Sequence, residues 1–370
     1  MSANQQPIGT AERESQKRER VVAALSGGVD SSVAAALLVG EGREVIGVTL
    51  NLAGGASRCC SLSDADDARR VADHLGIRFY VANYADRFRA EVIQPFADEY
   101  LSGRTPIPCV ACNSRFKFDY LLERARVFGA DRVATGHYAR VDVDPDNGLL
   151  RLRCAVDRHK DQTYFLFELG QEQLSAVEFP LGELEKDEVR SRARELGLAT
   201  AEKPESQEIC FVPDGDYATV VEKIRPGALP GGGEIVDREG QVLGQHPGIH
   251  HFTVGQRKGL GLSAEEPLYV AGLDAERNRV VVGGVDDLNA KGARIERVSW
   301  VSGVTPERAI RATVRVRYRH AGTSAMIEAR AAGQAIVSFD EPVRAVAPGQ
   351  AAVFYDDDIV LGGGWIAESL

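Results

Sequence analysis

A glycine- and serine-rich loop between an apolar run and an alanine-rich segment constrains this 370-residue chain more than any other feature. The loop reads Ser26-Gly27-Gly28-Val29-Asp30-Ser31-Ser32. It follows a predicted buried strand at 21–25 and opens a helix expected to end near residue 39. Two adjacent glycines let backbone N–H groups face an anion, and the helix start adds its positive end. The Gly-Lys-Ser/Thr ending of a Walker A loop and the glycine spacing of a dinucleotide fingerprint are both absent. We therefore predict a different kind of phosphate loop, in which Asp30 caps the helix or holds Mg²⁺.

Alternating strands and helices after this loop predict an α/β fold with a doubly wound parallel sheet. We expect further strands at 45–50, 79–82 and 132–135, and helices at 64–75 and 121–128. Ligands of such a sheet bind at the carboxyl ends of its strands.

The pattern changes after residue 212, where a helix at 217–224 precedes a Pro/Gly-rich linker and short strands. Strands expected at 311–318, 324–329, 334–338 and 351–355 suggest a small antiparallel barrel. The predicted organisation is a disordered tail (1–20), a nucleotide-binding catalytic domain (21–212), a small central α+β domain (213–288) and a C-terminal antiparallel β-barrel (289–370).

Composition narrows the class of protein further. The net charge of −10 argues against a protein that coats nucleic acid nonspecifically, although a local basic groove stays compatible with it. There is no run of about 18 apolar residues, and residues 1–20 lack the apolar core of a signal peptide. We therefore expect a cytoplasmic protein, a monomer with no membrane contact.

Six cysteines in a chain of this length are not a disulfide framework, so closely spaced ones point to metal or to reactivity. Cys109 and Cys112 form a Cys-x-x-Cys in a Pro-rich segment, and Cys210 lies far along the chain. One such pair is a weak zinc signal, because a closed zinc site needs four ligands. Reactive thiolates explain the pattern better. Cys154 is expected in the core, and Cys59 and Cys60 are assigned no role.

An ordered set of motifs carries a resemblance that covers the chain after residue 20. The phosphate loop resembles that of the ATP pyrophosphatase superfamily, and the whole set is similar to the bacterial tRNA-specific 2-thiouridylase family. The set comprises the phosphate loop, Pro106-Ile107-Pro108-Cys109-Val110-Ala111-Cys112-Asn113, Thr135-Gly136-His137-Tyr138, Lys160-Asp161-Gln162-Thr163-Tyr164-Phe165-Leu166, Glu208-Ile209-Cys210-Phe211, Gly255-Gln256-Arg257-Lys258-Gly259-Leu260-Gly261, Pro348-Gly349-Gln350 and Leu361-Gly362-Gly363-Gly364.

The resemblance implies that ATP adenylates the C2 oxygen of a tRNA wobble uridine and that sulfur then replaces this oxygen. By position, Cys112 is the nucleophile and Cys210 carries a persulfide supplied by a sulfur-relay protein or a cysteine desulfurase. A transient Cys112–Cys210 disulfide would release the sulfur. The implied ATP contacts are Ala24, Leu25, Ser26, Gly27, Gly28, Val29, Asp30, Ser31, Leu50 and Gly136. The implied tRNA contacts are Ile107, Pro108, Cys109, His137, Lys160, Asp161, Gln162, Arg317, Tyr318 and Gln350.

Charged residues in the last domain predict a further contact with nucleic acid. Arg315, Arg317 and Arg319 alternate on the expected strand and would share one face. With Arg311 and His320 they form a basic stripe suited to phosphates, although a charged strand face is often simply solvated.

Cys109 departs from the family pattern, because many members have aspartate there. Cys109 is thus an accessory candidate, and Cys109, Cys112 and Cys210 are an alternative ligand set for a [4Fe–4S] cluster with one open iron. Two rival functions are an amidotransferase or ligase with the same phosphate loop, and a nonenzymatic RNA-binding or cysteine-based sensor module. The first would need ammonia rather than Cys112 and Cys210, and the second leaves the phosphate loop unexplained.

Overall fold

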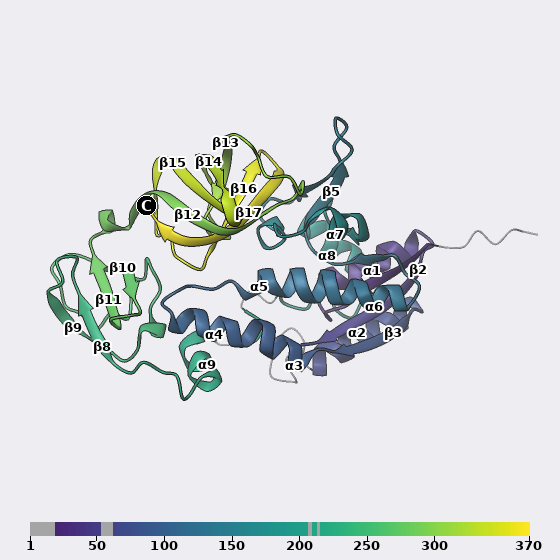
Figure 1. Cartoon of the computed structure of the whole chain (residues 1–370). Helices are drawn as coiled ribbons and strands as arrows, with labels where there is room; N and C mark the ends of the chain where they lie inside the picture. The colour runs from purple at the N-terminus through teal and green to yellow at the C-terminus, as the bar shows by residue number, and fades with distance from the viewer. Residues whose placement is uncertain (1–18, 53–61, 206–208, 213–214) are drawn as a thin grey trace, which may run out of the picture.

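The computed structural model describes residues 19–52, 62–205, 209–212 and 215–370. Most of the predicted tail, together with Cys59 and Cys60, lies outside the described residues. The chain forms three units that follow one another in sequence (Figure 1). Within the described ranges, no helix combines the length and the apolar character that crossing a membrane requires.

The first unit is built on a five-stranded parallel sheet with the order β3-β2-β1-β4-β7. The doubly wound sheet predicted from the sequence is confirmed, with β7 as an addition. Strand order reverses between β1 and β4, and sheets of this kind bind ligands in the crevice at the carboxyl ends of the strands there. The strands are β1 (Arg20–Ala24), β2 (Glu44–Asn51), β3 (Arg78–Asn83), β4 (Arg132–Ala134) and β7 (Val177–Glu178).

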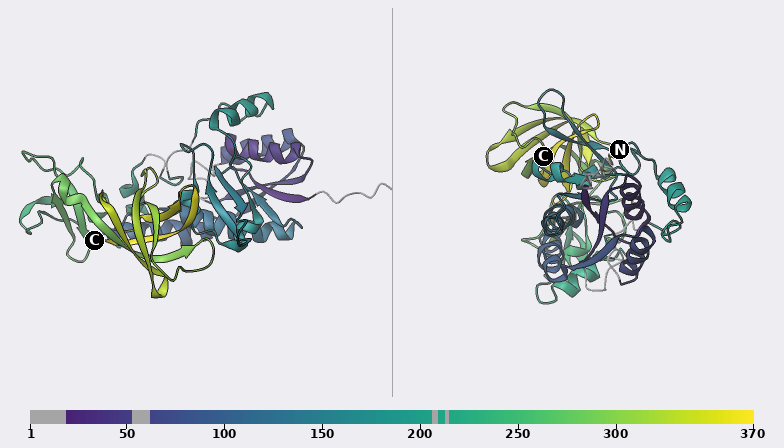
Figure 2. Two further views of the ribbon diagram at one scale, coloured as in Figure 1. Left: turned by 90° about the horizontal axis from the view of Figure 1, so that it is seen from above. Right: turned by 90° about the vertical axis from the view of Figure 1, so that its right-hand side faces the viewer.

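Helices cover both faces of this sheet (Figure 2). Val21 and Ala23 pack on one face with α1 and α2, whereas Val22 faces an aromatic-rich cluster on the other. This alternation of inward residues is what a strand buried on both sides requires. The helical segments are α1 (Val29–Gly40), α2 (Leu62–Leu75), α3 (Ala85–Phe88), η1 (Arg89–Ile93), α4 (Gln94–Leu101), α5 (Pro108–Ala111), η2 (Cys112–Tyr120), α6 (Leu121–Val127), η3 (Thr163–Phe165), α7 (Gln171–Ala176) and α8 (Lys186–Glu195).

One of these helices is longer than the sequence predicted. We expected a helix only at 121–128, yet α5, η2 and α6 run on without a break from Pro108. Pro108 stands at the first helical position, where its missing N–H costs no hydrogen bond and its fixed φ suits the helix. Cys109 and Cys112 therefore lie on a helix and not on a loop before one.

The second unit is small and lies between the other two in the chain. A four-stranded sheet of order β10-β11-β8-β9 encloses a core that includes Ile249, Phe252 and Val280. The elements are α9 (Tyr217–Ile224), β8 (Gly233–Val236), β9 (Val242–His246), η4 (Ile249–His251), β10 (Tyr269–Asp274), β11 (Arg279–Gly283) and η5 (Val285–Leu288).

The third unit is the predicted antiparallel barrel, which β12 closes by pairing with both β15 and β17. Its elements are β12 (Asn289–Trp300), β13 (Ile310–Arg315), β14 (Thr323–Arg330), η6 (Ala331–Gly333), β15 (Gln334–Arg344), β16 (Ala351–Asp356) and β17 (Ile359–Ser369). A hairpin of the first unit, β5 (Ala139–Val143) and β6 (Leu150–Cys154), extends the barrel sheet because β6 pairs with β17.

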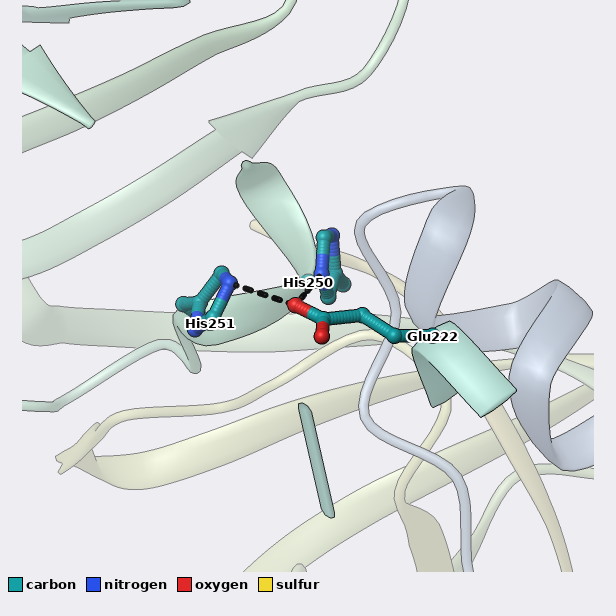
Figure 3. Close-up of side chains that lie close together, drawn as sticks. All are labelled: Glu222, His250 and His251. Atoms are coloured by element: carbon teal, nitrogen blue, oxygen red, sulfur yellow. Dashed lines mark hydrogen bonds and ion pairs between the residues drawn. The ribbon is translucent and has the colours of Figure 1, made fainter. Parts of the chain in front are cut away.

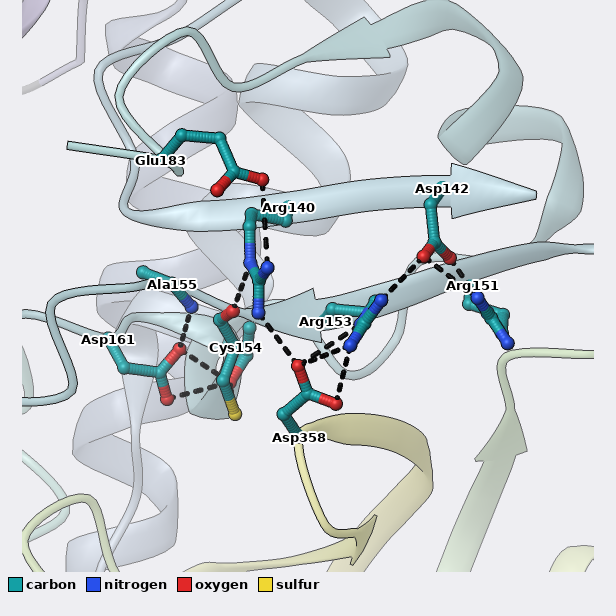
Figure 4. A network of polar contacts seen from close by, with 10 residues as sticks. Arg140, Asp142, Arg151, Arg153, Cys154, Ala155, Asp161, Glu183 and Asp358 are labelled. Carbon is teal, nitrogen blue, oxygen red and sulfur yellow. Dashed lines mark hydrogen bonds and ion pairs between the residues drawn. The ribbon is translucent and has the colours of Figure 1, made fainter. Parts of the chain in front are cut away.

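Ion pairs strengthen this junction. Asp358, immediately before β17, accepts hydrogen bonds from Arg140 at 2.7 Å and from Arg153 at 2.8 Å, both on the hairpin (Figure 4). Arg153 also pairs with Asp142, so the hairpin carries a connected charge network. The barrel is therefore anchored to the first unit by strand pairing and by charge.

The predicted basic stripe on the barrel is wrong. The strand expected at 311–318 ends at Arg315, so Arg317 and Arg319 lie beyond β13 and share no strand face with it. Arg315 itself turns inward: it pairs with buried Asp161 at 3.2 Å and stacks over the ring of Tyr355 at 4.4 Å. Alternation along a strand shows which residues share a face, but not whether that face meets solvent.

Candidate nucleotide and sulfur-transfer site

The phosphate loop leaves β1 and is held by its own serines. Gly27 has φ +72°, and a Cβ there would come within 2.2 Å of the Asp64 carbonyl oxygen, so only glycine fits. The Ser26 N–H donates to Ser31 Oγ at 3.1 Å, and the Ser32 hydroxyl donates to the Gly28 carbonyl at 2.7 Å. Gly28 caps α1 without a side chain, which leaves first-turn N–H groups for an anion.

Asp30 does not cap the helix, contrary to one of our two expectations. Its Oδ1 accepts hydrogen bonds from Lys186 Nζ at 2.7 Å and from the Tyr138 hydroxyl at 2.9 Å. Burial and the neighbouring Asp30 carboxylate raise the pKa of Tyr138 above its ordinary range, so Tyr138 stays a donor. Lys186 pairs in addition with Glu205 at 2.6 Å. The loop is thereby tied to the chain just before the Cys210 segment.

Lys186 was not among the site residues predicted from the sequence. It is the first residue of α8 and is buried, with only 9% of its side chain exposed. A lysine in the first turn opposes the helix dipole and needs compensating carboxylates. That unfavourable position is the local signal which could have singled Lys186 out.

Gly136 lies two residues beyond β4, against the phosphate loop, and its contact with ATP stays a prediction. A Cβ on Gly136 would stand 2.6 Å from the Ser31 nitrogen and 2.7 Å from the Asp30 carbonyl carbon. Leu50, near the end of β2, is buried in the apolar cluster on one face of the sheet, and its contact with adenine stays a prediction. Ala24 ends β1, and the Leu25 carbonyl accepts from Thr49 at 2.6 Å.

His137 connects this site to the helix that bears Cys112. Lys117 Nζ on η2 lies 3.4 Å from His137 Nε2, and Thr135 Oγ1 lies 2.7 Å from Nδ1. Burial, with a smaller contribution from Lys117, lowers the pKa of His137 well below its ordinary value. A neutral ring that accepts from Lys117 at Nε2 carries its proton on Nδ1. Lys117 was not foreseen, because nothing local distinguishes it.

Cys112 and Cys210 border the same apolar cluster, although 98 positions separate them in the chain. Both side chains are half-buried, and the cluster between them includes Phe116 and Phe211. Cys109, also half-buried, lies one helical turn before Cys112. Cys154 is fully buried, as predicted, and burial raises the pKa of its thiol.

The expected tRNA contacts fall on three segments of the first unit (107–109, 137 and 160–162) and on loops of the barrel. Gln350 Nε2 of the barrel donates to the Thr105 carbonyl at 2.9 Å, next to Ile107 and Pro108. The ring of Tyr318 lies 4.5 Å from that of Phe165, close to the 160–162 stretch. The structure therefore gathers these contacts near the cysteine helix.

Several of these side chains already have partners within the protein. Asp161 is buried against Arg315, Gln162 Oε1 accepts from the Tyr138 N–H at 3.0 Å, and Lys160 pairs with Glu205 at 2.7 Å. Arg317 donates to the carbonyl oxygen of residue 344 at 3.0 Å. Their contact with tRNA stays a prediction.

A serine-lined phosphate loop at the switch point of a parallel sheet, with two half-buried cysteines on an adjoining helix, defines a nucleotide-binding enzyme domain of the ATP pyrophosphatase type. Three family models match in order: the tRNA methyl transferase HUP domain over residues 19–214, its PRC-barrel domain over 220–284, and an aminomethyltransferase beta-barrel domain over 290–366. The chain belongs to the tRNA-specific 2-thiouridylase family.

Relatives named as members of this family match nearly the whole chain. The chain is 52% identical over 364 residues to the tRNA-specific 2-thiouridylase MnmA of Geotalea uraniireducens, covering 96% of each chain. It is 50% identical over 366 residues to that of Rhodospirillum rubrum, covering 95% of this chain and 96% of the relative. A solved U34-tRNA thiolase NcsA of Methanococcus maripaludis aligns at 20% identity over 57% of this chain and 69% of its own, with a TM-score of 0.35, too weak a likeness to carry an argument.

Proposed function

We propose that this protein is a tRNA-uridine 2-sulfurtransferase that uses ATP to activate the wobble uridine and a cysteine persulfide to thiolate it. The observation that supports this most directly is the three-residue segment after β4. Gly136 lies against the phosphate loop, the His137 ring reaches Lys117 on the Cys112 helix, and Tyr138 donates to Asp30. One rigid turn thus connects the nucleotide loop with the helix that presents a thiol.

The proposed reaction needs both halves of the site. Carbonyl C2 of uridine becomes a good electrophile once its oxygen has attacked the α-phosphate of ATP and pyrophosphate has left. The outer sulfur of a Cys210 persulfide attacks C2, and AMP departs with the oxygen. Cys112 thiolate then attacks the inner sulfur of Cys210 and breaks the S–S bond. Sulfur stays on C2, a Cys112–Cys210 disulfide forms, and a two-electron thiol reductant restores both cysteines.

Phosphate contacts fall to the backbone of the loop. The N–H groups at the start of α1 would hold the leaving pyrophosphate, and neutral His137 would donate its Nδ1–H to Thr135 Oγ1. One carboxylate oxygen of Asp30 is already taken by Lys186 and Tyr138, which leaves few ligands for a free Mg²⁺. Mg²⁺ would therefore arrive bound to ATP.

A specific feature keeps the iron–sulfur alternative open. Cys109 and Cys112 lie one turn apart on one helix, and Cys210 borders the same apolar cluster as Cys112. This donor set fits a [4Fe–4S] cluster, which would supply sulfide through its open iron.

A sulfur-relay protein or a cysteine desulfurase is the expected partner for the persulfide route. A cytoplasmic location and a monomeric state stay predictions.

Two measurements separate these possibilities. The protein is incubated with ATP, a persulfide donor and unmodified tRNA, and the tRNA is run on a mercury-containing gel that retards thiolated species. We expect retardation with wild type and none with Cys210→Ala. Retardation that survives this substitution, or ammonia incorporation without sulfur, would refute the proposal. Iron and sulfide analysis after anaerobic purification decides between the routes, because an iron-free protein with full activity rules out the cluster.

A further inference from the structure

A second group of potential ligands lies away from the phosphate loop, where α9 meets η4. The His–Glu cluster comprises Glu222 on α9 and His250 and His251 on η4 (Figure 3). In Figure 3 the two rings approach the Glu222 carboxylate from different sides. The proposed thiolation reaction uses none of these residues.

The spacing of the cluster is that of a metal site. Nε2 of His250 and Nε2 of His251 each lie 3.3 Å from the same oxygen, Glu222 Oε1. Charge-assisted hydrogen bonds to a carboxylate are shorter, about 2.7–2.9 Å. Ligands about 2.0–2.1 Å from a tetrahedral ion stand about 3.3–3.4 Å apart. Both N···O distances therefore equal the edge of a zinc tetrahedron.

Burial supports the same interpretation. His250 has only 3% of its side chain exposed, and within the described part of the chain its Nδ1 has no hydrogen-bond partner. Nε2, which lies 3.3 Å from Glu222 Oε1, is therefore the ring nitrogen placed to act as a ligand. His251 is one-third exposed, so water can reach the open side of the cluster.

The charge of the cluster also suits a dication. With a metal bound, two neutral imidazoles and one carboxylate would supply a single negative charge, because metal ligands must be deprotonated. A nitrogen-rich set with one oxygen favours zinc and its neighbours over Mg²⁺ or Ca²⁺.

We propose that Glu222, His250 and His251 bind one divalent transition-metal ion of the zinc type, with a water in the fourth position. Such an ion would join α9 to η4. Arg225, one residue beyond α9, pairs with Asp98 on α4 at 2.7 Å, so the ion would brace the joint between the first and second units. The site does not depend on the proposed sulfurtransferase function.

The test is the zinc stoichiometry of the full-length protein, measured by elemental analysis and by titration with Zn²⁺ after treatment with a chelator. The thiols also bind zinc, so every variant is compared in one Cys109→Ser, Cys112→Ser, Cys210→Ser background. We expect His251→Ala and Glu222→Gln to bind one equivalent less than that background. The matched control, His159→Ala, removes an exposed histidine outside the cluster and should keep the full stoichiometry.

Two melting measurements distinguish loss of the metal site from loss of the fold. Both variants change side chains that are at least one-third exposed, and their melting without metal should match the background. Added Zn²⁺ should raise the melting temperature of the background and of His159→Ala, but not that of His251→Ala. Equal stoichiometry and equal zinc-induced stabilisation in all four proteins would overturn the proposal.

Discussion

Gly136→Ala is the most direct test of the geometry around the phosphate loop. Gly136 has no left-handed φ, so alanine meets no backbone strain of its own. Its new Cβ would stand 2.6 Å from the Ser31 nitrogen and 2.7 Å from the Asp30 carbonyl carbon, both of them backbone atoms. Because neither is the end of a flexible side chain, the loop itself must move.

The size of the movement follows from these contacts. Opening 2.6 Å to an ordinary contact of about 3.4 Å displaces the loop by about 0.8 Å. Overpacking of this kind costs about 1–3 kcal/mol, and a misplacement of about 1 Å at a reacting group costs about 100-fold in rate. We therefore expect kcat/KM for ATP to fall about 10- to 100-fold, while the melting temperature falls by only a few degrees.

The assay is ATP-dependent thiolation of tRNA over a range of ATP concentrations, beside a thermal melt. Gly40→Ala is the matched control, since Gly40 lies at the far end of α1, the helix that follows the phosphate loop, and a Cβ there meets nothing within 4 Å. Gly40→Ala should keep wild-type kinetics. Wild-type kinetics for Gly136→Ala would refute the contact, and so would equal losses in both variants.

Three further predictions follow from buried contacts. Lys186→Met removes the shared cation of the loop network and should raise KM for ATP and lower the melting temperature, whereas an unchanged KM would separate this lysine from the site. Burial raises the pKa of Glu205, but hydrogen bonds from two lysines outweigh this effect and lower it. The ionised carboxylate therefore stabilises the fold at neutral pH, and this stabilisation is lost on acidification. The difference in unfolding free energy between wild type and Glu205→Gln should shrink as pH falls below the ordinary glutamate pKa. Asp358→Asn weakens the ion pairs that anchor the β5–β6 hairpin to the barrel, and it should lower the free energy of unfolding in denaturant by about 1–3 kcal/mol. An unchanged free energy of unfolding would show that these ion pairs are fully solvated.

The barrel also contacts the segment that precedes the cysteine helix. Thr105 donates its N–H to the carbonyl oxygen of residue 348 at 2.8 Å and accepts from Gln350 at 2.9 Å. Arg104 pairs with Glu296 on β12 at 3.0 Å. The barrel therefore holds the segment that leads directly into the cysteine helix, and damage to this contact should reach the thiols without touching them.

Local chemistry in the sequence determined much of this protein. The phosphate loop could be recognised from Ser26 to Ser32 because glycine pairs, serines and a flanking apolar run act through the nearest backbone. The parallel sheet, the barrel and the buried state of Cys154 followed from periodicity and composition for the same reason. The start of the cysteine helix did not, because Pro108 is compatible both with a loop and with a first helical turn.

Only the tertiary structure decided which distant groups meet. Lys186 reaches Asp30 across 156 positions, and the hairpin strand β6 joins β17 of the barrel across about 200 positions. Arg315 could be assigned to a basic strand face, yet packing turned it inward onto Asp161. Local sequence pattern shows which residues share a face or a turn. Tertiary packing determines which carboxylate lies beside a buried cation. Cys112 and Cys210 come to border one apolar cluster by the same long-range packing.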